Sequence, residues 1–377
     1  MAAYLDHAAT TPMRPEAIEA MLPWLTTHFG NPSGSHAVSR RARQAVDEAR
    51  ESIAGLLGCA PGEVIFTAGG TEADNLAIAG VVGATNGRAV CTAIEHHAVL
   101  HAVEAVNGAV VGVGPDAIVD LDALGRTIDP TVAVVSVMLA NNEIGTIQPL
   151  DDVADVVRRR APKAVLHTDA VQAFAWLDVA ALARRADLIS IAAHKFGGPK
   201  GVGALVVRSG VPVQPLLRGG GQERDLRSGT HNVAGIVSMA AAMQATVASR
   251  SQSAQRVRAL RDRLGDAIAA AVDGAVETGS REQRLPNLCH LRIAGIESES
   301  ALVLLDDAGV CASAGSACAS GAMEPSHVLS AMGVSREEAM SSLRFSLGWP
   351  STIDDVDEAV AALVDVVDRL RAPARAT

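Results

Sequence analysis

Short apolar runs alternate with segments of helical periodicity through the first two thirds of the chain. The run at 132–139, VAVVSVML, is continuous and rich in β-branched residues, which is typical of a strand buried on both faces. The segment at 150–161, LDDVADVVRRRA, instead places its apolar residues on one face of a helix. We predict strands at 63–70, 89–94, 132–139, 164–173, 186–195 and 202–208, and helices at 71–84, 96–106 and 150–161. Strands and helices that alternate at this spacing predict an α/β fold with a mostly parallel sheet covered by helices on both sides.

A long helical pattern follows from about Asn232 to Ala271, and the rest of the chain is typical of a smaller α+β unit. The length of 377 residues fits two domains, because a domain usually contains about 100–200 residues. We therefore expect a large domain at 14–256 and a small domain formed by 1–13 and 257–377.

The composition narrows the class of protein. The net charge of −10 argues against a general nucleic-acid or membrane surface. No apolar run approaches the ~18 residues of a membrane span, and the N-terminus lacks the pattern of a signal peptide. The five cysteines are odd in number, irregularly spaced and include no CxxC pair, so neither a disulfide framework nor a zinc ribbon is expected. A soluble, cytoplasmic protein with reduced thiols is predicted.

Polar residues gather where the predicted strands end, which is where ligands bind in open α/β sheets. FTAGGT (66–71) leads glycines into a helix, with Thr71 as the expected N-cap, and such a turn offers free N–H groups to a phosphate. Taken alone, it is equally compatible with a simple turn, and it matches neither GxGxxG nor the P-loop. Asn142 can donate to a carboxylate or a ring oxygen, with an asparagine turn as the alternative. Asp169 can cap a helix or hold a protonated ring nitrogen, and Gln172 would face the same side.

Lys195 ends the predicted strand at 186–195. Burial there would lower the pKa of its amine and make the amine nucleophilic. A surface lysine in a loop is the alternative, which the neighbouring phosphate turn and Asp169 weaken. A Schiff-base lysine, an acid for a pyridinium nitrogen and a phosphate cradle are together the requirements of pyridoxal 5′-phosphate (PLP). His194 can reach the phosphate, and His96, past another strand end, can stack on the ring and move protons.

Two further features concern metal binding and mobility. His97 and His101 have the i, i+4 spacing of metal ligands, but no third ligand with an obvious spacing accompanies them, so we predict no metal site. CASAGSACASG (311–321) contains two cysteines and no large side chain, so it cannot pack as a core segment. We expect high mobility between about Ala314 and Pro325.

These motifs, in this order, resemble the cysteine desulfurases of the class V aminotransferase group, which are fold type I PLP enzymes. The similarity runs nearly end to end, and GSAC leading into EPSHVL resembles the branch with an extended cysteine loop. It rests on YLDHAATTP (4–12), GNPSGSHAVSRRAR (30–43), FTAGGTEADN (66–75), EHHAVL (95–100), NNEIGTIQP (141–149), HTDAVQ (167–172), HKFGGPKG (194–201), GGGQERDLRSGT (219–230), SAGSAC (313–318) and SLRFSLG (342–348).

The resemblance implies a role for each matching residue of the cofactor site. Lys195 matches the lysine that binds PLP, Asp169 the partner of the pyridinium nitrogen, and Gln172 the donor to the ring O3′. His96 matches the stacking histidine that handles protons. The implied phosphate contacts are Gly70, Thr71 and His194.

The resemblance also implies how substrate and sulfur are handled. Asn142 and Arg344 match the residues that hold the substrate carboxylate, with Asn142 also beside the cofactor, and Cys318 matches the nucleophile. Thr230 matches a threonine that reaches the phosphate of the partner subunit, which implies a homodimer with shared sites. One position departs from the family, because the serine often found three residues before the PLP lysine is Ala192 here. One phosphate contact is therefore missing from the expected set.

The implied activity is conversion of L-cysteine to L-alanine with transfer of sulfur to Cys318 as a persulfide. An iron–sulfur scaffold protein or a tRNA-thiolation enzyme would receive the sulfur. A selenocysteine lyase, another PLP-dependent C–S lyase or an aminotransferase on the same fold are the alternatives. A non-enzymatic scaffold is a further alternative, against which the intact set of Lys195, Asp169, His96 and Cys318 argues.

Overall fold

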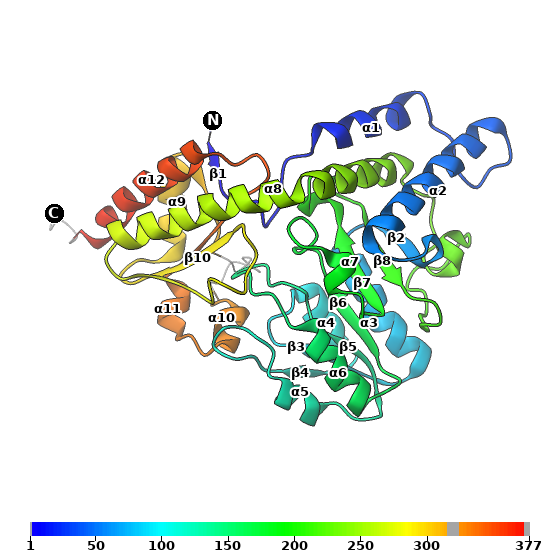
Figure 1. The fold of residues 1–377 in the computed structure, drawn as a ribbon, viewed down its shortest axis with the longest axis horizontal. Coiled ribbons are helices and arrows are strands. Elements are labelled where there is room, and N and C mark those ends of the chain that lie inside the picture. Colours follow the sequence, from blue (N-terminus) through cyan, green and yellow to red (C-terminus); the bar gives the residue numbers. More distant parts are fainter. Residues whose placement is uncertain (1, 315–323, 373–377) are drawn as a thin grey trace.

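A seven-stranded sheet forms the centre of the computed structural model, which describes residues 2–314 and 324–372 (Figure 1). Strand β8 is antiparallel to both of its neighbours, and the other strand pairs are parallel. The strands in spatial order are β2 (Val64–Thr67), β8 (Gly203–Val207), β7 (Leu188–Ala192), β6 (Val165–Asp169), β5 (Val132–Ser136), β3 (Arg88–Thr92) and β4 (Ala109–Val111). The predicted α/β fold with a mostly parallel sheet is confirmed.

Helices cover both faces of this sheet, because successive strand side chains point to opposite sides. Cys91 and Val134 pack in one apolar cluster with α3 and α4, whereas Val90 and Val135 pack in the other with α2, α6 and α8. The helices of this region are α1 (Pro15–Thr26), α2 (Ala37–Leu57), α3 (Gly70–Thr85), α4 (His97–Ala105), α5 (Leu121–Thr127), α6 (Leu150–Arg160) and α7 (Val179–Leu182). Single 3₁₀ turns occur at η1 (Pro61–Glu63), η2 (Ala193–Lys195) and η3 (Gln222–Asp225).

A smaller layer of strands and helices lies beside the main sheet, and α8 (Val233–Ala271) runs along both parts (Figure 1). Its antiparallel sheet has the order β12-β10-β9, and the N-terminal strand β1 pairs in parallel with β11. The strands are β1 (Ala3–Tyr4), β9 (Ala275–Glu277), β10 (Leu288–Ile293), β11 (Val310–Cys311) and β12 (Ser342–Ser346). The helices are α9 (Ser298–Asp307), α10 (His327–Ala331), α11 (Arg336–Met340) and α12 (Ile353–Arg371).

The structure corrects the local predictions at several strand and helix ends. Thr71 is not the N-cap of α3, because Gly69 takes that place and Thr71 already lies in the first turn. Gly69 has a φ of +152°, which favours glycine. The strands expected at 164–173 and 186–195 end at Asp169 and Ala192. Lys195 therefore lies in the 3₁₀ turn that follows β7. No helix within the described ranges is long and apolar enough to cross a membrane.

Candidate active site

The carboxyl ends of the parallel strands open into one cavity of about 380 Å³. Among the described residues, every site residue predicted from the sequence lines this cavity except Thr230. The lining residues are Ala8, Ala9, Gly70, Thr71, Asp74, His96, Met138, Asn142, Asp169, Val171, Gln172, Ala192, His194, Lys195, Ser313 and Arg344. The cavity is thus built by strand ends of the main sheet together with the N-terminal segment and β12.

The N-terminus of α3 forms a glycine cradle at one end of the cavity. A Cβ atom on Gly70 would lie 2.9 Å from Cγ2 of Val171, so a larger residue at position 70 would displace another residue of the cavity lining. The first-turn N–H groups of a helix favour an anion. The exposed Thr71 and the half-buried His194 flank the cradle, and an adjoining open groove includes Lys200. This end of the cavity is suited to a phosphate group.

The Lys195 amine is held inside the cavity by the N-terminal segment. Its Nζ donates to the carbonyl oxygens of Ala8 (2.6 Å) and Ala9 (3.0 Å). Burial, and then the positive charge of Arg344, lower the pKa of Lys195 to about 8, although the charge of Asp169 opposes them. Part of the lysine population is therefore neutral near physiological pH, as a nucleophilic amine requires.

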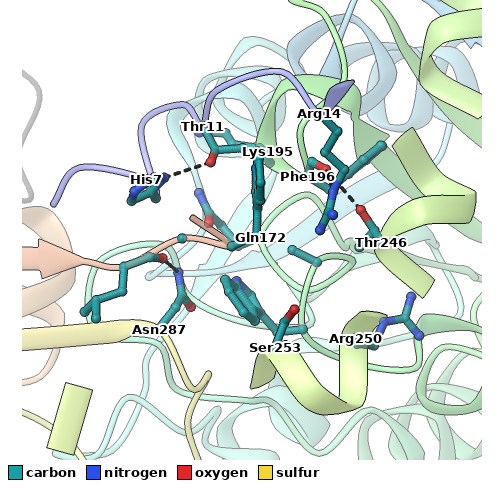
Figure 2. A pocket seen from close by; sticks show the side chains of 15 residues that line it. His7, Thr11, Arg14, Gln172, Lys195, Phe196, Thr246, Arg250, Ser253 and Asn287 are labelled. Atoms are coloured by element: carbon teal, nitrogen blue, oxygen red, sulfur yellow. Dashed lines mark hydrogen bonds between the residues drawn. The ribbon is translucent and has the colours of Figure 1, made fainter. Parts of the chain in front are cut away.

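A second, much smaller cavity lies behind Lys195 (Figure 2). It has a volume of about 20 Å³, which is room for about one water molecule. Arg14 and Asn287 form part of its wall, and His7 Nδ1 lies 2.7 Å from Thr11 Oγ1 beside it (Figure 2). The main cavity is therefore the only one of the two with room for a cofactor.

Asp169 supplies a carboxylate at the end of β6, on the floor of the main cavity. Its Oδ1 accepts a hydrogen bond from the backbone N–H of Val171 (2.8 Å). Burial raises the pKa of Asp169 to about 6, whereas that hydrogen bond and the charge of Lys195 lower it. Gln172 also faces this cavity, and its Nε2 donates to the carbonyl of Ala8 (2.8 Å). Asp169 and Gln172 thus face the same cavity, as the sequence predicted.

A buried polar network that sequence reasoning missed lies beneath Asp169. Asp74 is 2% exposed, and its Oδ1 lies 3.6 Å from Nε2 of His167. His167 is within hydrogen-bond distance of Ser136 (2.8 Å) and Ser190 (2.9 Å). Burial raises the pKa of Asp74 well above its usual range, and the charge of Asp169 raises it further. The raised pKa of Asp74 favours its protonated form, which leaves less negative charge beside Asp169.

The sequence did contain a signal for Asp74. It occupies the apolar face of α3, four residues before Ile78 and seven before Val81, and both of those are fully buried. An aspartate at such a position is unusual, and it indicates a carboxyl group pointing into a site.

Arg344 reaches the same cavity from β12 of the smaller sheet. It donates from Nη1 to the carbonyl of Asn142 (3.0 Å) and from Nη2 to Asp6 (2.8 Å). Its Nε is buried and has no partner among the described residues. The guanidinium is thus fixed on two sides, with a donor left for a carboxylate ligand. Asp6 was not predicted, because it is far from Arg344 in the sequence.

His96 stands at the rim of the cavity as the N-cap of α4. Its Nδ1 accepts from the N–H of Ala98 (3.1 Å). Although the ring remains exposed to solvent, surrounding protein and then the charge of Lys195 lower the pKa of His96 to about 4. His96 is therefore neutral at physiological pH. Its neighbours His97 and His101 have ring centres 5.1 Å apart, and residues 2–314 and 324–372 contain no group of three or more possible ligands placed to hold a metal ion.

One predicted residue that the structure describes is absent from the cavity lining, and another lies outside the described ranges. Thr230 is exposed and lines a separate hollow with Arg227 and His231. Cys318 lies outside the described residues, as does most of the segment at 314–325 for which high mobility was predicted. Cys311, the other cysteine of that segment, is half-buried in β11.

Comparisons with known proteins agree on one family. Residues 3–359 match the family model described as aminotransferase class-V. The chain is 43% identical to a cysteine desulfurase of Cereibacter sphaeroides over 98% of this chain and 96% of that protein. It is 45% identical to an IscS-like cysteine desulfurase of Mycobacterium tuberculosis over 99% of this chain and 98% of that one. The fold matches a solved NifS-like protein with a TM-score of 0.92 and 34% identity, covering 98% of this chain and all of that one.

Proposed function

This chain belongs to the aminotransferase class-V family and, within it, to the cysteine desulfurases, and from that premise we propose how its site works. PLP occupies the main cavity, and L-cysteine is converted there to L-alanine, with its sulfur passing to Cys318. One observation supports this most strongly. Lys195, Asp169 and the Gly70 cradle, which are far apart in the sequence, line a single cavity with Arg344.

The described residues fit PLP. The Gly70 cradle, where a Cβ atom would crowd Val171, suits the phosphate, and Thr71 and His194 line the same cavity. Asp169 suits the protonated ring nitrogen, because it places a carboxyl group in the cavity at the end of β6. When bound, PLP supplies a conjugated, protonated ring that stabilises the carbanion left after loss of the substrate α-proton. Gln172 would donate to the ring O3′, and His96 would stack on the ring.

The substrate carboxylate is held by Arg344 and Asn142. Arg344 is already fixed by Asp6 and by the Asn142 carbonyl, so little freedom is lost when the substrate binds. Lys195, whose pKa is lowered to about 8, takes the α-proton and returns it, because its neutral amine is available near physiological pH. His96, which is neutral, takes part in the proton transfers of substrate activation.

The Cys318 thiolate then attacks the sulfur of the substrate. The new bond joins the two sulfur atoms, and the Cβ–S bond of the substrate breaks. The bonding pair leaves with Cβ, which takes up a proton to become the methyl group of alanine. Cys318 keeps the substrate sulfur as a persulfide, so one cysteine and one thiol give one alanine and one persulfide without an external oxidant.

The larger assembly follows from the same proposal. We propose a homodimer in which Thr230 of each subunit reaches the phosphate of the other, and a cytoplasmic location. The large domain comprises 14–256 and the small domain 1–13 with 257–377. The persulfide sulfur passes to an acceptor protein, such as an iron–sulfur scaffold or a tRNA-thiolation enzyme.

Absorption spectroscopy and mass mapping test this function. The purified protein is expected to show the visible band of lysine-bound PLP, which changes when L-cysteine is added, and mass spectrometry should find an added sulfur on Cys318. Lys195→Ala is expected to lose the band. Cys318→Ala should keep the band but lose persulfide and sulfide formation. Retained turnover in Cys318→Ala would contradict the proposal and favour a selenocysteine lyase or another C–S lyase.

A further inference from the structure

Ser313 and Ser326 lie on either side of the segment that contains Cys318. Both are hydrogen-bonded to residues next to the proposed carboxylate site. On the N-terminal side, Ser313 exchanges two backbone hydrogen bonds with Arg344, at 3.1 and 2.6 Å. On the C-terminal side, Ser326 donates to Oε2 of Glu143. Glu143 directly follows Asn142, the second carboxylate-site residue.

The Glu143–Ser326 contact is fully enclosed. The two residues are 2% and 3% exposed. The Ser326 hydroxyl also accepts from the N–H groups of Val328 (3.1 Å) and Leu329 (3.3 Å), so that it caps α10. One hydroxyl group therefore joins the start of α10 to the turn that carries Asn142.

The turn that carries Asn142 and Glu143 is also held by hydrogen bonds. The side-chain oxygen of Asn141 accepts from the N–H groups of Glu143 (2.8 Å) and Ile144 (3.0 Å). Arg344 donates to the carbonyl of Asn142 (3.0 Å). Glu143 is bonded to Ser326 and is covalently linked to Asn142, whose carbonyl binds Arg344. Movement of Glu143 would therefore be transmitted directly to Asn142.

Apolar contacts dock α10 on the same edge of the main sheet. Val328 and Leu329 pack in one buried cluster with Ile94, Met138 and Ile144. His327 adds a contact of 2.9 Å from Nε2 to the carbonyl of Glu95. This packing would hold α10 in place without Glu143. The carboxyl group therefore serves to orient the start of α10 and contributes little to its attachment.

A buried carboxyl group costs free energy, because burial disfavours its charged form, so simple attachment of α10 does not explain Glu143. Burial raises the pKa of Glu143 to about 7, and the Ser326 bond and the charge of Arg344 only partly offset this effect. An apolar side chain of similar volume would often be as stable or more stable at such a position. The presence of the carboxyl group is better explained by a need to fix the geometry.

We propose that Glu143 is a positioning residue for sulfur transfer, which acts through Ser326 to hold the C-terminal flank of the Cys318 segment in register with Asn142 and Arg344. The inference rests on the proposed function, because it assumes that Cys318 receives the sulfur. It predicts that the Glu143–Ser326 pair serves the step at Cys318 and leaves cofactor binding and substrate activation unaffected.

Two variants remove the Glu143–Ser326 hydrogen bond, and one preserves it. Glu143→Leu has a similar volume but no acceptor, and Ser326→Ala removes the donor. Both are expected to slow persulfide formation on Cys318 about tenfold or more, because small misplacements of reacting groups cost this much. Glu143→Gln keeps an oxygen that accepts from Ser326 and should stay within about threefold of the wild-type rate. The rate is measured on the PLP-loaded full chain by rapid quenching, alkylation and mass spectrometry.

The cofactor half of the reaction provides the second readout. The change of the visible PLP band on adding L-cysteine, and the KM for L-cysteine, should stay within about twofold in both variants, because Asn142 and Arg344 are retained. Ser335→Ala is the matched control. Ser335 also caps a short helix and bonds a glutamate, Glu338 (2.8 Å), but on α11 and at the surface. It should leave both readouts unchanged.

Three results would overturn the inference. They are an unchanged persulfide rate in Ser326→Ala, a parallel fall of both readouts, and an equal effect of Ser335→Ala. If Glu143→Leu does not fold, Ser326→Ala and Glu143→Gln still decide the question. A wild-type protein that shows the spectral change but forms no persulfide would instead contradict the proposed function.

Discussion

At the scale of single residues, Lys195 shows how the fold prepares a side chain for chemistry. Two backbone carbonyls bind its Nζ, while burial and Arg344 disfavour the charged form. The lysine is thus oriented as an ammonium group yet is easily deprotonated. A free lysine has a pKa of about 10.4, so the lowered pKa makes the neutral amine far more abundant near pH 8.

The first prediction concerns the uptake of PLP by the cofactor-free protein. The rate of Schiff-base formation should rise with pH and level off above a midpoint of about 8, because only the neutral Lys195 amine is nucleophilic and its pKa is lowered to about 8. Stopped-flow absorbance between pH 6.5 and 10 measures the rate. Replacing the exposed Lys163 with alanine should leave the midpoint unchanged. A midpoint near that of free lysine would contradict the prediction.

The second prediction concerns Ala192, the position at which the resemblance would often place a serine. Ala192 is 1% exposed and lines the main cavity beside Gly70. Ala192→Ser would supply a hydroxyl at the phosphate end and should tighten PLP binding roughly three- to tenfold, since hydrogen bonds to charged groups are among the stronger ones. Fluorescence titration of the cofactor-free protein measures the Kd.

Ala193→Ser is the control for that experiment. Ala193 is equally buried but does not line the cavity, so its variant should show no gain in affinity. An unchanged Kd in Ala192→Ser would mean that backbone N–H groups already saturate the phosphate.

At the scale of elements, the sequence predicted the positions of site residues best where those residues directly follow a strand. Asp169, Lys195 and Gly70 could be placed because each follows a recognisable apolar run, and parallel strands bring such ends to one edge. The lengths were overestimated, since Ala170, Val171 and Ala173 are apolar although they lie beyond the end of β6. Hydrophobicity alone does not mark where the ladder of backbone hydrogen bonds stops.

Contacts between elements distant in the sequence could not be predicted. Asp6 binds Arg344 across 338 positions, and Ser326 binds Glu143 across 183. Nothing in the local pattern around any of these residues specifies its partner, because register between separate elements is decided by the packed tertiary structure. Asp74 is different, since its place on an apolar helix face could have revealed it.

The third prediction concerns the loop between β8 and α8. Glu223 is buried there and accepts hydrogen bonds from Arg50 (2.6 and 2.8 Å), from the N–H of Phe66 (2.8 Å) and lies 2.7 Å from His231. Although burial opposes it, these contacts lower the pKa of Glu223 to about 2. Glu223→Gln should therefore lower the free energy of unfolding at pH 7 by about 3 kcal/mol.

Urea denaturation measures this difference, and its pH dependence has a definite sign. The folded-state pKa is depressed, so the stabilisation is present above pH 4.5 and is lost as the pH falls toward about 2. The gap between wild type and Glu223→Gln should thus shrink between pH 5 and pH 3. Asp129→Asn, which breaks the exposed Arg88–Asp129 pair, should cost much less, because solvent screens exposed ion pairs. Equal losses in the two variants would contradict the argument.

At the scale of the whole molecule, the surface next to the glycine cradle is unusual. Leu216 and Leu217 are 43% and 47% exposed, and they line the open groove that also contains Thr71 and His194. Exposed apolar side chains that gather beside a site are typical of surfaces covered by another protein. Because this surface adjoins the proposed phosphate site, a second subunit here could supply a cofactor contact, as proposed for Thr230.

Mixing two defective variants tests whether the sites are shared. In the proposed homodimer, a Lys195→Ala subunit still offers Thr230 to its partner, and a Thr230→Ala subunit still has Lys195. A mixed dimer therefore contains one intact site. With random pairing, half of the dimers are mixed, so about a quarter of all sites should be restored. Alanine release at limiting PLP, after co-refolding of equal amounts, should then exceed the average of the two separate variants.

A subunit carrying both substitutions, mixed with Thr230→Ala, is the matched control and should restore nothing, because no pairing completes a site. Equal activity in the two mixtures would show that Thr230 acts within its own subunit or not at all.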